Sequence, residues 1–163
     1  MAIIYISLGT NIDRDHYLEQ GLLGLEQAFG QLTLSSLFES ASVGFNGSDF
    51  YNMVIAAETE LPIAQVVTTL KDIERANGRK PSAKKFSSRT LDLDLLLYDD
   101  VVTEQPIQLP RAEITENAFV LWPLQELAGA LLHPELNISY DELWRNYDKS
   151  SQQLRIVPFN WQR

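Results

Sequence analysis

The residues best suited to chemistry are two aspartates in a leucine-rich run at residues 90–98, where the leucines at positions 91, 93, 95 and 97 alternate with other residues. In a strand this alternation puts the four leucines on one face and Asp92 and Asp94 on the other. The Cβ atoms of the two aspartates then lie roughly 7 Å apart, because each residue rises about 3.3 Å. Two ionised carboxylates at this spacing repel each other unless a cation joins them, and Mg²⁺ prefers oxygen ligands. The pair therefore predicts a magnesium site, and the alternative is an edge strand with a solvated polar face.

A concentrated basic segment precedes the aspartates. Seven of the thirteen lysines and arginines fall between positions 71 and 89, although the chain carries a net charge of −9. A basic segment beside two carboxylates indicates a small polyanionic ligand, and a solvated lysine-rich loop is the alternative. The negative net charge argues against nucleic acid or an anionic membrane as a partner.

Several familiar kinds of site are missing from the sequence. It has no G-x-x-x-x-G-K-[ST] loop, no G-x-G-x-x-G turn and no kinase catalytic-loop set, so any use of ATP proceeds without a P-loop. It has no cysteine, which excludes disulfides, thiolate metal sites and cysteine nucleophiles. His16 and His133 are far apart in sequence, and each is predicted to be a structural residue.

Hydrophobic periodicity predicts the elements that position these groups. Strands are expected over residues 2–9, 31–40, 50–58 and 90–98, and helices over 15–29 and 62–77. The order strand, helix, strand, strand, helix, strand predicts an α+β fold: a ferredoxin-like βαββαβ core with an antiparallel sheet covered by helices. The remaining third is expected to add a short strand pair near 101–109, helices near 116–128 and 140–146, and a strand at 154–158.

Length and composition predict one domain over residues 1–163, because a chain with 45% hydrophobic residues can form a core of ordinary size. The first residues lack a basic region, and no apolar run approaches the roughly 20 residues of a membrane span. A monomeric cytoplasmic protein without a membrane partner is therefore expected.

Five short motifs follow one another along the chain. They are YISLGTN at residues 5–11, DFYN at 49–52, E-x-x-x-G-R at 74–79, KFSSRTLDLD at 85–94 and FVLWPL at 119–124. In order and spacing they resemble the 6-hydroxymethyl-7,8-dihydropterin pyrophosphokinase family, and RTLDLD is the most specific part. The resemblance covers the chain from position 3 to about position 135.

The resemblance implies transfer of a diphosphate from ATP to the hydroxymethyl group of the pterin, with release of AMP, as a step of folate biosynthesis. ATP and the reduced pterin are the small-molecule substrates. Asp92 and Asp94 are implied to bind two Mg²⁺ ions and, with Arg79 and Arg89, to form the catalytic set. The residues implied to contact ATP are Glu74, Arg79, Lys84, Lys85, Arg89 and Arg111.

A second group of residues is implied to bind the pterin. Phe50 and Phe119 would stack on the two faces of the flat ring, and Asn52 would bond to its polar edge. The remaining members of the group are Ser40 and Val43, which match backbone contacts, and Phe86, which stands where the family usually has tryptophan.

Four positions depart from the family pattern. Pro81 and Asn117 stand where arginine is common, Arg111 stands where histidine is expected, and Ala112 replaces an aromatic residue. Losing a charged hydrogen bond costs about 1.5–3 kcal/mol, so weaker ATP binding is expected unless Arg111 takes over a phosphate contact. Two hypotheses remain: an active pyrophosphokinase, or a non-catalytic pterin- or nucleotide-binding paralogue that acts as a sensor or partner subunit. The retained aspartates favour the enzyme.

Overall fold

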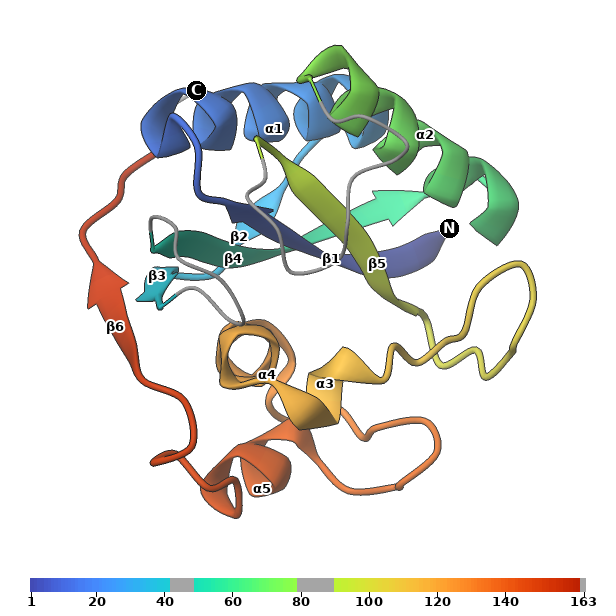
Figure 1. Ribbon diagram of the computed structural model, residues 1–163. Coiled ribbons are helices and arrows are strands. Elements are labelled where there is room, and N and C mark those ends of the chain that lie inside the picture. Colours follow the sequence, from blue (N-terminus) through green and yellow to red (C-terminus); the bar gives the residue numbers. More distant parts are fainter. Residues whose placement is uncertain (42–48, 79–89, 162–163) are drawn as a thin grey trace.

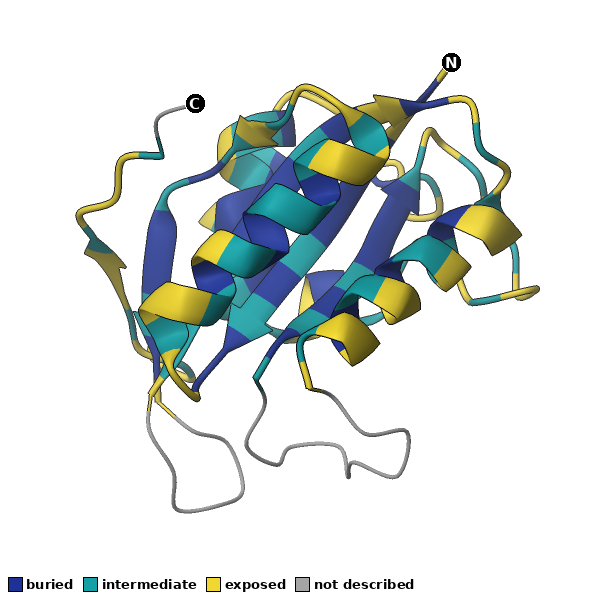
Figure 2. Cartoon of the chain, turned by 90° about the horizontal axis from the view of Figure 1, so that it is seen from above, coloured by how far each residue is buried: buried dark blue, intermediate teal, exposed yellow. Residues whose placement is uncertain are grey.

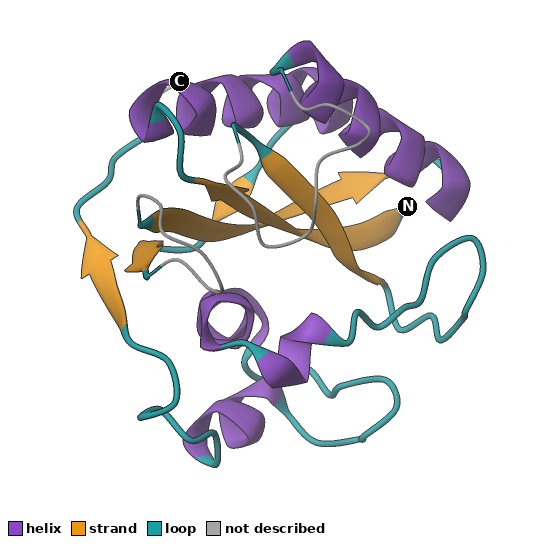
Figure 3. Ribbon diagram, viewed as in Figure 1, coloured by secondary structure: helices purple, strands orange, loops and turns teal. Residues whose placement is uncertain are grey.

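The structure of the protein, a computed structural model, describes residues 1–41, 49–78 and 90–161. In chain order its elements are β1 (Ala2–Thr10), α1 (Arg14–Phe29), β2 (Thr33–Leu34), β3 (Leu37–Ser40), β4 (Phe50–Thr59), α2 (Ile63–Ala76), β5 (Asp92–Tyr98), α3 (Glu113–Glu116), α4 (Ala118–Ala128), α5 (Tyr140–Arg145) and β6 (Leu154–Val157). Helices α1 and α2 lie on one face of the sheet, and α3, α4 and α5 lie on the other (Figure 1; Figure 3 separates helices from strands by colour).

The strands form one antiparallel sheet. Their order is β5-β1-β4-β3-β6, with β2 paired to β4 beside β3, and every pairing is antiparallel. The predicted α+β class with an antiparallel sheet is therefore confirmed. The expected strand at 154–158 is also present, because β6 pairs with β3 and extends the sheet.

Two cores lie on the two faces of this sheet. Ile4, Ile6 and Leu8 of β1 pack with Leu22 and Leu70 under α1 and α2. Viewed from above, these helices lie over buried strands and turn their exposed sides outward (Figure 2). The alternate residues of the strands point to the other face and pack against α4. There the strand residues Tyr5 and Val54 form a buried cluster with Leu121 and Leu124 of α4. Because both faces are covered, the strand sequences carry apolar residues on both sides.

The leucine alternation of β5 is interrupted near its end. Leu95 pairs with Ile6 and Leu97 pairs with Tyr5, so two steps along β5 match one step along β1. Such an extra residue moves the following side chain to the other face. Leu97 consequently lies in the core under α4, whereas Leu91, Leu93 and Leu95 lie under α1 and α2. The prediction that Leu97 shares their face was wrong.

Other segments differ from the predicted elements. The expected strand over 31–40 is divided into β2 and β3, and Ser35 between them exchanges hydrogen bonds of 2.9 Å with the backbone of Val54. The expected strand pair near 101–109 is reduced to a single bridge between Thr103 and Leu109. Within residues 1–41, 49–78 and 90–161, no helix combines the length and apolar character needed to cross a membrane.

The connection between α4 and α5 folds around a buried histidine. The His133 side chain is only 6% exposed, and its Nδ1 accepts the backbone N–H groups of Glu135 at 3.2 Å and Leu136 at 3.1 Å. Burial lowers the pKa of His133 below the ordinary value, against a smaller opposite effect of Glu135. An Nδ1 that accepts hydrogen bonds must be unprotonated, so this connection depends on neutral His133.

We expect the free energy of unfolding to decrease as pH falls below about 6.5, because the unfolded chain then binds a proton that folded His133 excludes. One proton limits this decrease to about 1.4 kcal/mol per pH unit. Urea denaturation between neutral and mildly acidic pH measures it. In His133→Gln the decrease should shrink, whereas in His16→Gln, at an exposed position, it should persist. An unchanged pH dependence in His133→Gln would contradict this account.

Candidate active site

Residues of four strands form a row across the face of the sheet that α4 covers. Gly9 in the central strand pairs with Asp92 of β5 on one side and with Asn52 of β4 on the other, and Asn52 also pairs with Phe38 of β3. Directly opposed residues of antiparallel strands point to the same face. The register therefore brings Asp92 and Asn52 onto one face, separated only by a glycine. Asp94 follows in the next row, opposite Ser7.

Gly9 places no side chain between Asp92 and Asn52 on this face of the sheet. A Cβ at this position would lie 3.7 Å from Asn52 Oδ1 and 3.8 Å from Phe50 Cδ1, so the glycine backbone faces these side chains directly. The predicted strand over residues 2–9 is present, and β1 continues through Gly9 to Thr10. Glycine inside a strand often marks close approach of a ligand, and that signal was available in the sequence.

The two carboxylates lie beside a cation from a distant part of the chain. Asp94 Oδ1 accepts a hydrogen bond from Arg111 Nη2 at 3.2 Å, and Arg111 Nε donates to Glu113 Oε2 at 2.7 Å. Burial alone would lower the pKa of Arg111, but the charges of Asp94, Glu113 and Asp92 outweigh it and raise the pKa. The pairing of Arg111 with Asp94 was not predicted from the sequence, because the two residues belong to separate motifs.

Asp92 and Asp94 suit a hard cation that takes its remaining ligands from water and substrate. No cluster of three or more His, Cys, Asp or Glu side chains able to hold a metal occurs in the part of the chain that the structure describes. Asp92 and Asp94 are both half-buried and share a face. As aspartates, they offer a metal ion only carboxylate oxygens. Mg²⁺ is commonly bound through one or two carboxylates, with water and substrate oxygens completing its octahedron. The pair fits that pattern and would not complete a zinc site.

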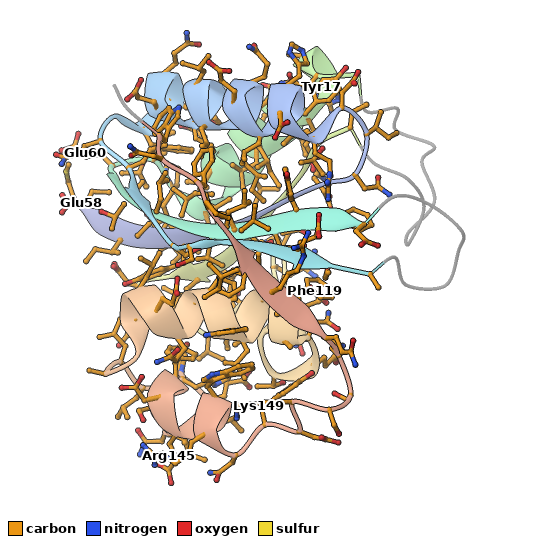
Figure 4. All side chains as sticks on the ribbon, turned by 90° about the vertical axis from the view of Figure 1, so that its left-hand side faces the viewer. Tyr17, Glu58, Glu60, Phe119, Arg145 and Lys149 are labelled. Atoms are coloured by element: carbon orange, nitrogen blue, oxygen red, sulfur yellow. The ribbon has the colours of Figure 1, made fainter. Side chains whose placement is uncertain are left out.

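Those predicted pterin residues that the structure describes lie on this same face. Asn52 is 6% exposed and Ser40 8% exposed, and Asn52 Nδ2 donates to Ser40 Oγ at 2.7 Å. Phe50 begins β4 and is half-buried beside Gly9. Phe119, in the first turn of α4, packs against the core between that helix and the sheet (Figure 4). Two aromatic rings, a buried amide and two carboxylates therefore share one side of the sheet.

Glu74 has a structural contact of its own. This residue of α2 is 8% exposed, and its Oε2 accepts the backbone N–H of Leu93 at 2.7 Å. Leu93 belongs to β5, the edge strand of the described sheet. A carboxylate at this position satisfies a backbone donor that would otherwise be buried without an acceptor.

The departure at Asn117 also has a structural role. Asn117 precedes α4, and its Oδ1 accepts a hydrogen bond from Gln152 Nε2 at 3.1 Å. Gln152 Oε1 in turn accepts the N–H of Ala118 at 2.7 Å, which satisfies a free donor at the start of α4. These contacts hold the helix turn that carries Phe119. The remaining predicted site residues lie outside the described residues; they are Val43, Arg79, Lys84, Lys85, Phe86 and Arg89.

Comparison with known proteins gives the family. The model of the 7,8-dihydro-6-hydroxymethylpterin-pyrophosphokinase (HPPK) family matches residues 5–129. The chain belongs to the HPPK family. Curated HPPK relatives named 2-amino-4-hydroxy-6-hydroxymethyldihydropteridine pyrophosphokinase include one from Aquifex aeolicus, 32% identical over 82% of this chain and 85% of its own length. Another, from Porphyromonas gingivalis, is 35% identical over 83% of this chain and 96% of its own length. The predicted pyrophosphokinase family is confirmed.

Solved HPPK structures share the fold. A structure of HPPK-DHPS in complex with substrates superposes with a TM-score of 0.71 over 92% of this chain, at 13% identity. Plasmodium falciparum HPPK-DHPS with pterin and p-hydroxybenzoate gives 0.71 over 91% of this chain, at 17% identity. The match covers 44% and 43% of those longer chains, so the present chain corresponds to less than half of each.

We expect Glu74→Ala to lower the free energy of unfolding by about 1–3 kcal/mol, because the buried N–H of Leu93 loses its acceptor. Glu74→Gln keeps an oxygen acceptor and should cost less. Chemical denaturation of the nucleotide-free protein measures both variants, with the exposed Glu116→Ala as a control. Wild-type stability in Glu74→Ala would mean that this carboxylate serves ligand binding alone.

Proposed function

We propose that this chain transfers the diphosphate of ATP to the hydroxymethyl oxygen of 6-hydroxymethyl-7,8-dihydropterin in folate synthesis. Membership of the HPPK family and the names of the curated relatives support this function. The observation that carries the proposal is the pairing of Gly9 with Asp92 on one side and with Asn52 on the other. It puts a carboxylate and an amide on one face of the sheet, with only a glycine between them. A flat polar substrate at Asn52 would thus lie next to a phosphate site at the aspartates.

In the proposed reaction the pterin hydroxymethyl oxygen bonds to the β-phosphorus of ATP. The bond between that phosphorus and the oxygen bridging it to the α-phosphate breaks, AMP leaves with the bridging oxygen, and the hydroxyl proton is released. Catalysis of such a transfer is mostly positioning and charge stabilisation. Asp92 and Asp94 would hold two Mg²⁺ ions, whose charge offsets that of the phosphoryl oxygens. Contacts of Glu74, Arg79, Lys84, Lys85, Arg89 and Arg111 with ATP remain part of the proposal.

The pterin would bind between aromatic rings. Phe50 and Phe119 supply the faces, and an offset-stacked pair contributes about 0.5–1.5 kcal/mol beyond area burial. The hydrogen bond to Ser40 fixes the amide of Asn52, so its oxygen and second N–H can meet the donors and acceptors of the pterin edge. A fixed, buried amide rejects analogues that leave it unpaired.

The finer fold assignment is also proposed. The antiparallel order β5-β1-β4-β3, with α1 and α2 on one face, supports a ferredoxin-like βαββαβ core to which α3, α4, α5 and β6 are added. One domain over residues 1–163, a monomeric state and a cytoplasmic location stay predictions from the sequence.

The nucleotide product tests the function. The protein is incubated with ATP, Mg²⁺ and 6-hydroxymethyl-7,8-dihydropterin, and nucleotides are separated by chromatography. AMP formed in step with pterin diphosphate supports the proposal. ADP would indicate single phosphoryl transfer, and absence of both products would favour the non-catalytic paralogue.

We expect Asp92→Ala and Asp94→Ala each to slow AMP formation by about 100-fold or more, because charge stabilisation of the transition state is lost. Neither change should alter the free energy of unfolding by more than about 1 kcal/mol, since ion pairs at half-exposed positions contribute little. Asp100→Ala, an exposed aspartate just after β5, is the control for kinetics and stability. A large loss of stability without nucleotide would make the pair structural.

We expect Asn52→Ala to weaken pterin binding about 10-fold or more, the effect of roughly 1.4 kcal/mol in lost hydrogen bonding. Calorimetric titration with the pterin measures the affinity, and titration with a non-hydrolysable ATP analogue shows that the nucleotide site is intact. Asn146→Ala, at an exposed helix end, is the control. Equal pterin affinity in Asn52→Ala and the parent would remove Asn52 from the site.

A further inference from the structure

Arg111 lies where a metal ion would compete with it. Its guanidinium reaches Asp94 Oδ1 through Nη2 at 3.2 Å and Glu113 Oε2 through Nε at 2.7 Å. The three side chains are between 28% and 35% exposed, so ligands from solvent can reach them. One oxygen of the carboxylate pair is thus already bonded to a cation of the chain itself.

The backbone and Nε of Arg111 are fixed by hydrogen bonds, whereas its two Nη groups can bond to a partner other than Asp94. The backbone N–H of Arg111 donates to the carbonyl of Leu96 in β5 at 3.0 Å, and the preceding Leu109 and Pro110 are buried. Glu113, in the first turn of α3, holds Nε. The two Nη groups extend beyond this anchor, and they can bond to a carboxylate or to a phosphate with similar geometry.

We propose that Arg111 is the resident counter-ion of Asp94 in the nucleotide-free protein, and that a divalent cation must displace it. This inference rests on the proposed function, because it takes Asp92 and Asp94 as the metal ligands. A metal ion and a guanidinium at the same carboxylate oxygen repel each other, so the two compete for Asp94 Oδ1. The displaced guanidinium, still held by Glu113, becomes available to a nucleotide phosphate.

The consequence is cooperative binding of metal and nucleotide, with Arg111 as the residue that couples the two sites. Metal binding alone has to break the pair of Arg111 with Asp94, whereas nucleotide gives the displaced arginine a new anionic partner. Each ligand therefore raises the affinity for the other by the same factor. Because arginine is charged at every working pH, the charge of Arg111 itself does not limit the pH range of this coupling.

Metal binding without nucleotide tests the inference directly. Mn²⁺ binding is followed by the paramagnetic resonance signal of free Mn²⁺, and weak binding by the rise in Tm at millimolar Mn²⁺. We expect Arg111→Ala to bind Mn²⁺ about 3- to 10-fold more tightly than the parent, the range expected for removing a half-exposed ion pair and a nearby positive charge. Arg111→Lys, which keeps the charge, should stay close to the parent. With a non-hydrolysable ATP analogue, Arg111→Ala should bind the nucleotide about 10-fold less tightly.

Two controls separate this inference from the proposed function. Arg145→Ala removes the same charge from α5, on the far side of α4 from the sheet (Figure 4), and should leave Mn²⁺ binding unchanged. In the background of Asp94→Asn, Arg111→Ala should tighten Mn²⁺ binding less than it does in the parent, because the ion pair is already absent and only the nearby positive charge is removed. Equal nucleotide-free Mn²⁺ binding or stabilisation in Arg111→Ala and the parent would overturn the inference and leave the function intact. Unaltered Mn²⁺ binding in Asp92→Asn and Asp94→Asn with nucleotide present would instead remove the metal site of the proposed function.

Discussion

The pairing of β1 with both β4 and β5 around Gly9 is the constraint on which the candidate site depends. Side chains along a strand alternate between faces, so a shift of one residue in either pairing would reverse every side chain of the shifted strand. If β5 were the shifted strand, Asp92 and Asp94 would point into the core beneath α1 and α2, and Leu91, Leu93 and Leu95 would point toward α4. The burial of these leucines thus fixes the register that exposes the carboxylates.

Two acidic groups at β5, Glu74 of α2 and Asp94 of the strand itself, are stabilised in different ways. Glu74 is buried and accepts a backbone N–H of β5, so its charge supports the edge of the sheet. Asp94 is half-exposed and is paired with a guanidinium whose stem is bonded to the same strand. Strands disfavour aspartate, and each contact reduces the cost of holding negative charge there. The first contact lies in the buried interior, whereas the second is accessible to solvent and is the one that we propose a metal ion replaces.

The sequence predicted what local pattern determines. Alternation gave β5 and the common face of Asp92 and Asp94, and helical spacing gave α1 and α2. It did not reveal the extra residue near Leu96 that moves Leu97 to the other core, because that irregularity arises from pairing with β1. The contact of Arg111 with Asp94 joins positions 17 residues apart, and no periodicity relates them. The contact of Glu74 with Leu93 likewise depends on how α2 packs over β5.

The segment after residue 136, beyond the motifs, contributes to the site indirectly. β6 pairs with β3, the strand that carries Ser40, and Arg155 of β6 shares the carboxylate of Glu39 with Arg14 of α1. These hydrogen bonds, first to Arg14 and then to Arg155, lower the pKa of Glu39 and keep it charged. Just before β6, Gln152 bonds to Asn117 and to the first N–H of α4. Asn117, which the sequence analysis counted among the departures from the resembled pattern, serves here as an anchor of α4. The C-terminal segment therefore supports Ser40 on one side of the candidate site and Phe119 on the other, which connects the least typical part of the sequence to two residues that we propose bind the pterin.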